Sequence, residues 1–125
     1  MRNFEDMFRE LLELDNAMDK YEWIIEYGER GISLDQGHCT DSNLVRGCQS
    51  PLWLARYENT FVCHADSMIV NGIAKMIVDY YNQADEGSRQ YFDLTTLTAI
   101  GLAPMLSMGR QNGVANLIRR LKELT

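Results

Sequence analysis

The sequence predicts an α+β fold in which a small three-stranded antiparallel sheet packs against several helices. Apolar residues recur at helical spacing near both ends of the chain, whereas three short strand-like segments follow one another between residues 43 and 64. The length of 125 residues is that of one domain with one core. We therefore expect residues 1–125 to form a single domain.

Two amphipathic helices are expected at the N-terminal end. The first spans roughly residues 3–13 and is apolar on one face. The polar pair at residues 15–16 breaks its pattern, and a second helix starts near Met18. That helix should end at Gly28 or Gly31, because either glycine can supply a left-handed C-cap. The apolar face of the first helix holds Phe4, Met7, Phe8, Leu11, Leu12 and Leu14.

Three strands are predicted after a polar surface loop at residues 31–42. They span residues 43–46, 52–57 and 60–64, with a hairpin turn at residues 58–59 between the last two. Two strands alone would be marginally stable, whereas three strands packed against helices make a stable sheet.

Helices return after the sheet. A long central helix should begin at an N-cap formed by Asp66 or Ser67. Residues 82–92 predict a short helix, and residues 94–102 predict one or two helical turns. Ser107 should cap the final helix. The apolar stripe of that final helix consists of Val114, Leu117, Ile118, Leu121 and Leu124.

The formal charge of −6 argues against a nucleic-acid binder, which would normally carry a basic face. The charge is uneven, because the first thirty residues are acid-rich whereas the final helix is basic. Such asymmetry can steer a charged partner, although two solvated helix faces are the simpler explanation. No apolar run approaches the roughly 20 residues that cross a bilayer, so we expect no membrane segment. The first residues do not resemble a signal peptide.

The three cysteines, Cys39, Cys48 and Cys63, contain no CxxC pair, which excludes a zinc ribbon and a thioredoxin-type motif. Without a secretory signal, we expect reduced thiols and a cytoplasmic protein. Together with His38 and His64, these cysteines offer ligand types for zinc or an iron–sulfur cluster. The ligands lack paired spacing, however, and Cys63 and His64 would face opposite sides of a strand. We therefore expect no metal site.

The segment between the first two predicted strands places Cys48 near the tip of a loop. Gly47 lets the backbone turn there, and Pro51 belongs at the start of a strand. Most unpaired cysteines are buried and behave as small hydrophobic residues, whereas a cysteine on a polar loop can be reached by a partner or a substrate. On the residues alone, Cys48 can be an ordinary loop cysteine or a nucleophile.

Residues 45–50, Val-Arg-Gly-Cys-Gln-Ser, followed by Trp53 and Leu54, resemble the SufE family (SufE and CsdE). Three further segments resemble this family in the same order, at residues 21–28, 69–73 and 110–113. The resemblance therefore covers nearly the whole chain, and the Gly-Cys-Gln-Ser element with Trp53 is its most specific part. It implies a SufE/NifU-like fold.

The resemblance implies a sulfur acceptor and carrier that works as a partner of a cysteine desulfurase rather than as a stand-alone enzyme. Cys48 would accept persulfide sulfur from a SufS- or CsdA-like desulfurase, enhance its activity, and pass the sulfur to a SufBCD-like iron–sulfur scaffold complex. The chain would need no cofactor of its own, since the pyridoxal phosphate (PLP) belongs to the desulfurase. We expect a monomer or a weak homodimer.

The family pattern also assigns supporting residues around Cys48. Four of them would hold the loop, and two would dock the partner or support the loop. The first set is Arg46, Gly47, Gln49 and Ser50, and the second is Arg110 and Asp66. The sequence does not decide whether the guanidinium of Arg46 or of Arg110 reaches Cys48.

The chain departs from the family pattern in three places. Residues 108–109 are Met-Gly where the family tends to have Pro-Ser, Pro51 follows Ser50, and residues 63–68 are altered. The last change leaves open whether His64 or Asp66 takes the family's acidic position. Two other functions remain as alternatives: a metal- or iron–sulfur-binding scaffold of related fold, and a non-catalytic desulfurase adaptor.

Overall fold

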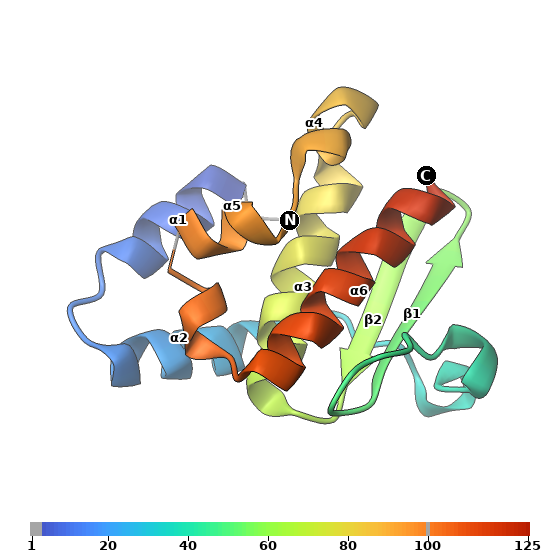
Figure 1. Ribbon diagram of the computed structural model, residues 1–125, viewed down its shortest axis with the longest axis horizontal. Helices are drawn as coiled ribbons and strands as arrows, with labels where there is room; N and C mark the ends of the chain where they lie inside the picture. Colours follow the sequence, from blue (N-terminus) through green and yellow to red (C-terminus); the bar gives the residue numbers. More distant parts are fainter. Residues whose placement is uncertain (1–3, 100) are drawn as a thin grey trace.

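The computed structural model describes residues 4–99 and 101–125 (Figure 1). Helices and a small antiparallel sheet make up an α+β fold, which confirms the predicted fold class. Residue 3 of the first predicted helix and residue 100 of the 94–102 segment lie outside the described residues. The α-helices are α1 (Phe4–Leu12), α2 (Ala17–Arg30), α3 (Met68–Gln83), α4 (Glu86–Tyr91), α5 (Leu94–Ala99) and α6 (Met108–Leu124). The strands are β1 (Leu52–Tyr57) and β2 (Thr60–Ala65), and short 3-10 helices lie at η1 (Gln36–His38), η2 (Asp41–Asn43) and η3 (Ala103–Met105).

Helix α3 is the centre of the molecule, with α2 on one side, the β1–β2 hairpin on another and α6 across it (Figure 1). Every residue from Ile69 to Val78 is buried, so this helix is enclosed around its whole circumference. None of the described helices combines the length and apolar character needed to span a bilayer.

Helix α2 does not end at Gly28 but continues to Arg30, with Gly31 as its C-cap residue in an extended and not a left-handed conformation (φ −72°, ψ 162°). The reason is a close crossing with α3. A Cβ at Gly28 would lie 2.9 Å from the Cα of Gly72, and a Cβ at Gly72 would lie 2.1 Å from the carbonyl oxygen of Ile24. These two glycines therefore serve interhelical packing rather than helix termination.

The predicted caps of the two long C-terminal helices are confirmed in part. The hydroxyl of Ser67 accepts a hydrogen bond from the N–H of Val70, and Ser107 accepts one from Arg110 in the same way. Asp66 lies one residue before the cap and is not used. Serine at these positions satisfies a backbone donor that the helix cannot pair internally.

The predicted strand at residues 43–46 is wrong, and among the described residues the sheet has two strands. Residues 41–43 form η2 instead, and Leu44 makes a single isolated bridge with Trp53. Gly47 then adopts a φ of +81°, which turns the chain before a second pair can form. Hairpin β1–β2 is stabilised by packing on α3 rather than by a third strand.

Candidate functional site

Residues 46–51 form a loop that is closed at its base and carries Cys48 near its tip. The N–H of Val45 donates to the carbonyl oxygen of Leu52 (2.8 Å). The next pair of residues away from the loop, Leu44 and Trp53, forms an isolated antiparallel bridge. On the other side, the N–H of Asp66 donates to the carbonyl oxygen of Pro51 (3.1 Å). The loop is therefore anchored at both ends, and its own residues line a shallow hollow of about 260 Å³.

The tip of the loop lies on the first turns of α6. A Cβ added at Gly113 would lie 2.9 Å from the Cys48 Sγ and 3.3 Å from the Cys48 Cα. A Cβ added at Gly109 would lie 2.6 Å from the Oε1 of Gln49. The loop and the helix therefore touch closely at two positions one helical turn apart.

The Cys48 thiol is half-buried and packs against the edge of the hydrophobic core. Burial raises its pKa above the ordinary thiol value, and no charged group contributes to this shift. The shift of the Cys48 pKa therefore comes from loss of solvent and not from Arg46 or Arg110. With the loop in this position, Cys48 is a protonated thiol at neutral pH.

Gln49 and Ser50 differ in how they hold the loop. The hydroxyl of Ser107 donates to the Oε1 of Gln49 (3.1 Å), so the loop is tied to the N-cap residue of α6. Gln49 acts here as a hydrogen-bond acceptor. Ser50 is half-buried and makes no side-chain hydrogen bond within the described part of the chain.

Arg46 lies in the loop itself, whereas Arg110 lies in the first turn of α6. Arg46 is exposed and lines a hollow of about 320 Å³ together with Val45 and residues of α6. Those α6 residues are Asn116, Arg119, Arg120 and Glu123. Arg110 is half-buried in the first turn of α6, and no hydrogen bond between its guanidinium and the described loop residues is present.

Asp66 and His64 lie together at the base of the loop. The Nε2 of His64 is 3.8 Å from the Oδ1 of Asp66, and the ring of His64 stacks on Trp53 with centroids 6.1 Å apart. The other ring nitrogen, Nδ1, is buried without a hydrogen-bond partner in the described structure. The altered segment thus places an acid and an imidazole side by side, next to the backbone anchor at Pro51.

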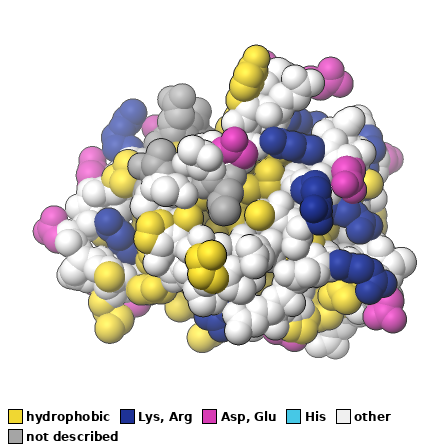
Figure 2. Space-filling view, viewed as in Figure 1, with side chains coloured by type: hydrophobic (Ala, Val, Ile, Leu, Met, Phe, Trp, Pro, Cys, Tyr) yellow, Lys and Arg dark blue, Asp and Glu magenta, His cyan; other side chains and the backbone are white. Residues whose placement is uncertain are grey.

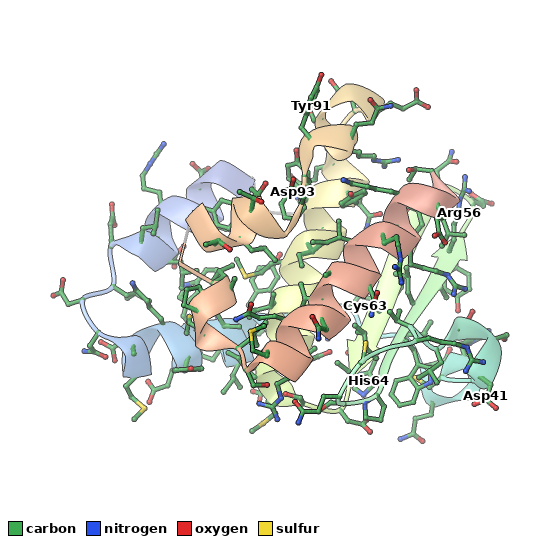
Figure 3. The ribbon with its side chains drawn as sticks, viewed as in Figure 1. Asp41, Arg56, Cys63, His64, Tyr91 and Asp93 are labelled. Carbon is green, nitrogen blue, oxygen red and sulfur yellow. The ribbon has the colours of Figure 1, made fainter. Side chains whose placement is uncertain are left out.

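The other two cysteines have different surroundings. Cys63 is fully buried on β2, and burial raises its pKa to about 12. His64 follows it on the opposite, partly exposed face of the strand, as expected from strand geometry (Figure 3). Cys39 is half-buried beside η1. Within residues 4–99 and 101–125, no three His, Cys, Asp or Glu side chains converge as metal ligands would.

Sequence reasoning singled out Arg110 of the final helix but missed the contacts that Gly109 and Gly113 make with the loop. Gly109 and Gly113 stand four residues apart inside a helix, where glycine is unfavourable and therefore indicates a packing requirement. Their spacing places both glycines on one face of the helix and so indicates that this face packs closely against another segment. What they pack against could not be inferred from spacing alone.

A further hollow of about 360 Å³ lies on α1, α2 and α3, away from Cys48. Trp23, Tyr27 and Asp79 are among its lining residues, and the hydroxyl of Tyr27 donates to the Asp79 carboxylate. Burial raises the pKa of Asp79. This hollow contains no cysteine, so it is separate from the thiol site.

Comparisons with known proteins match nearly the whole length of this chain. The family model described as "SufE: Fe-S metabolism associated domain" matches residues 5–125. An uncharacterized SufE-like protein from Rhizobium meliloti (strain 1021) is 28% identical over 131 aligned residues, covering 98% of this chain and 94% of the relative. Another from Rhizobium etli is 27% identical over 132 aligned residues, with 98% and 89% covered.

Proposed function

Since this chain belongs to the SufE family of Fe–S metabolism associated domains, we propose that it is a sulfur acceptor and carrier. Cys48 takes persulfide sulfur from a cysteine desulfurase and passes it toward iron–sulfur cluster assembly. The observation that carries this proposal is the position of the thiol. Cys48 is half-buried near the tip of a loop whose base is anchored on both sides.

The transfer is a thiol exchange with no net oxidation or reduction. The Cys48 thiolate attacks the outer sulfur of the donor persulfide, which carries the proton. A bond forms between that sulfur and the Cys48 Sγ, while the bond between the outer sulfur and the donor cysteine breaks. The donor cysteine leaves as a thiolate, and Cys48 now bears the persulfide.

The resting loop protects the thiol but does not activate it. Because burial raises the pKa of Cys48, the reactive thiolate is scarce until the tip of the loop leaves α6. The Val45–Leu52 and Asp66–Pro51 backbone bonds hold the base, so residues 46–50 can swing out without unfolding β1. Docking of the donor would supply this displacement, and the return of the loop would shield the product.

The donor is a PLP-dependent cysteine desulfurase of the SufS or CsdA type, whose activity rises when Cys48 removes its sulfur. The receiver is a SufBCD-like scaffold complex. The exchange belongs in the cytoplasm, where thiols stay reduced, in keeping with the unpaired state of Cys39, Cys48 and Cys63. Arg110 and Asp66 flank the loop and are the residues that we assign to docking or loop support.

The deciding experiment is intact-protein mass spectrometry after incubation with a cysteine desulfurase and free cysteine. We expect the protein to gain one or more sulfur atoms, and a reductant should reverse the gain. The Cys48→Ser variant should gain none, whereas a Cys39→Ser control should still load. Desulfurase activity is followed in parallel.

Retained loading of Cys48→Ser with an active desulfurase would exclude Cys48 as the acceptor. If that variant loads no sulfur and still stimulates the desulfurase fully, the chain is a non-catalytic adaptor instead. Nothing in the described residues favours the alternative of a metal-binding scaffold.

A further inference from the structure

Three positions of α6 lie on one side of the helix and contact three consecutive residues of the loop. Gly109, Gly113 and Asn116 are spaced four and three residues apart, which places them in one row. Gln49 lies against Gly109 and Cys48 against Gly113, whereas a Cβ at Gly47 would come within 2.3 Å of the Asn116 Nδ2. The loop thus runs along α6 in the opposite direction, with one loop residue for each helical turn.

The contact at Gly113 differs from the one at Gly109. The three atoms nearest to a Cβ at Gly113 are the Sγ, Cβ and Cα of Cys48, at 2.9, 3.1 and 3.3 Å. Relief of that overlap requires the backbone of Cys48 to move. A Cβ at Gly109 would meet the side chain of Gln49, and a change of rotamer can relieve much of that overlap.

Helix formation itself does not call for a glycine at position 113. This residue is buried in the second turn of a helix that runs from Met108 to Leu124, where alanine would be the better helix former. The glycine is therefore explained by what lies against it, which is Cys48.

We propose that Gly113 is the positioning residue for Cys48. The missing Cβ lets the loop lie directly on α6, so that the thiol is turned inward and shielded until a partner draws the loop away. The biological meaning of this role rests on the proposed function. In that function, Gly113 controls how reactive the Cys48 thiol is while the loop lies on α6. Packing against α6 removes solvent from the thiol and so lowers its reactivity, and no charged neighbour contributes to this effect.

The test compares Gly113→Ala with the unmodified protein, using alkylation by iodoacetamide over a range of pH. Peptide mapping reports Cys48 separately from Cys39 and Cys63. We expect Cys48 in the variant to react about tenfold faster near neutral pH, the effect of a one-unit fall in thiol pKa. The midpoint of its pH–rate profile should move toward that of an ordinary thiol.

Two control variants and one internal control accompany this measurement. Gly109→Ala should change the Cys48 rate less, because it displaces the side chain of Gln49 instead. Gly87→Ala should leave it unchanged, since that Cβ would meet only the Asp85 Oδ1, at 3.6 Å. Cys63 is fully buried and should stay unreactive as long as the variant is folded.

Equal rates and equal midpoints for Gly113→Ala and the unmodified protein, with Cys63 still protected, would overturn the assignment. If Gly113→Ala does not fold, Cys63 will react as well, and the double variant Cys48→Gly/Gly113→Ala, which lacks both the sulfur and the Cβ of residue 48, is then compared with Cys48→Gly. Equal melting temperatures of these two variants support the overlap with the Cys48 side chain, whereas a lower melting temperature of the double variant contradicts it.

The alkylation measurement needs no desulfurase, so its outcome is independent of sulfur loading. The role of Gly113 can be contradicted while sulfur loading succeeds, and it can be supported while loading fails. Where loading succeeds, the persulfide on Gly113→Ala should be reduced by dithiothreitol several times faster than the persulfide on the unmodified protein. Equal lifetimes would contradict the shielding role even if Cys48 is the acceptor.

Discussion

Cys48 and Cys63 show how burial gives two thiols different chemistry within one small molecule. Both thiols have a raised pKa, and desolvation is the main cause for each. Cys48 lies on a loop whose tip rests on α6, so a local movement is enough to return it to solvent. Cys63 lies on β2 within the core and can ionise only if the structure opens. We therefore assign reactivity to Cys48 and a packing role to Cys63.

A first prediction concerns alkaline stability. The folded pKa of Cys63, about 12, is above its unfolded value, so the stability from the protonated thiol is fully present below about pH 9. It is lost as the pH rises toward 12, by up to about 1.4 kcal/mol per pH unit. Chemical denaturation at several pH values should show this slope, and Cys63→Ala should flatten it. An unchanged slope in the variant would assign the alkaline loss to other groups.

At the level of elements, the end of α2 and the following loop depend on one buried side chain of α3. Lys75 is 3% exposed, and its Nζ donates to the carbonyl oxygen of Gly28 (2.5 Å) and to the Oγ of Ser33 (2.5 Å). A longer contact of 3.5 Å reaches the carbonyl oxygen of Gly31. Carbonyl groups at a helix C-terminus lack internal partners and favour a cation, so Lys75 completes the helix from outside.

A second prediction follows for this lysine. Lys75→Met keeps most of the aliphatic stem but removes the donor from three oxygen atoms. We expect the free energy of unfolding to fall by roughly 1–3 kcal/mol, the cost of buried acceptors left unpaired. Urea denaturation measures the loss, with the exposed Lys122→Met as the matched control. Equal stability of both variants would mean that water replaces the ammonium group at the end of α2.

At the level of the whole molecule, charge is separated along the long axis. Residues 4–30 hold nine acids and three bases, whereas α6 holds four bases and one acid. Figure 2 shows Lys and Arg side chains gathered on the side of the molecule where Figure 1 places α6. We define the basic face as Arg46, Arg119 and Arg120, which line one hollow beside the Cys48 loop.

A third prediction is that this basic face steers the partner. Arg120→Glu should slow association with the desulfurase several-fold at low salt, and the difference should shrink as salt screens the charges. Arg9→Glu on α1 reverses a charge at the opposite end and should have little effect. Association rates are measured by stopped-flow fluorescence at several salt concentrations. Equal slowing by both variants would indicate net charge rather than a directed surface.

Local patterns determined much of this protein. Helical spacing and serine caps gave the long helices, because hydrogen bonds between near neighbours decide both. The hairpin at residues 52–65 followed from two apolar segments and a short turn. The place of Cys48 near the tip of a loop also followed from its neighbours, Gly47 and Pro51.

Tertiary contacts decided the remainder. The expected third strand is replaced by η2 and one bridge, because the turn at Gly47 carries the chain onto α6. The burial of Lys75 and the contact between Cys48 and Gly113 join elements that are far apart along the chain. The spacing of Gly109 and Gly113 indicates a closely packed face of α6, but the residue that packs there depends on how separate elements come together. The sequence singled out Cys48 as the candidate acceptor, whereas only the packing of its loop on α6 decided that the thiol is half-buried against Gly113.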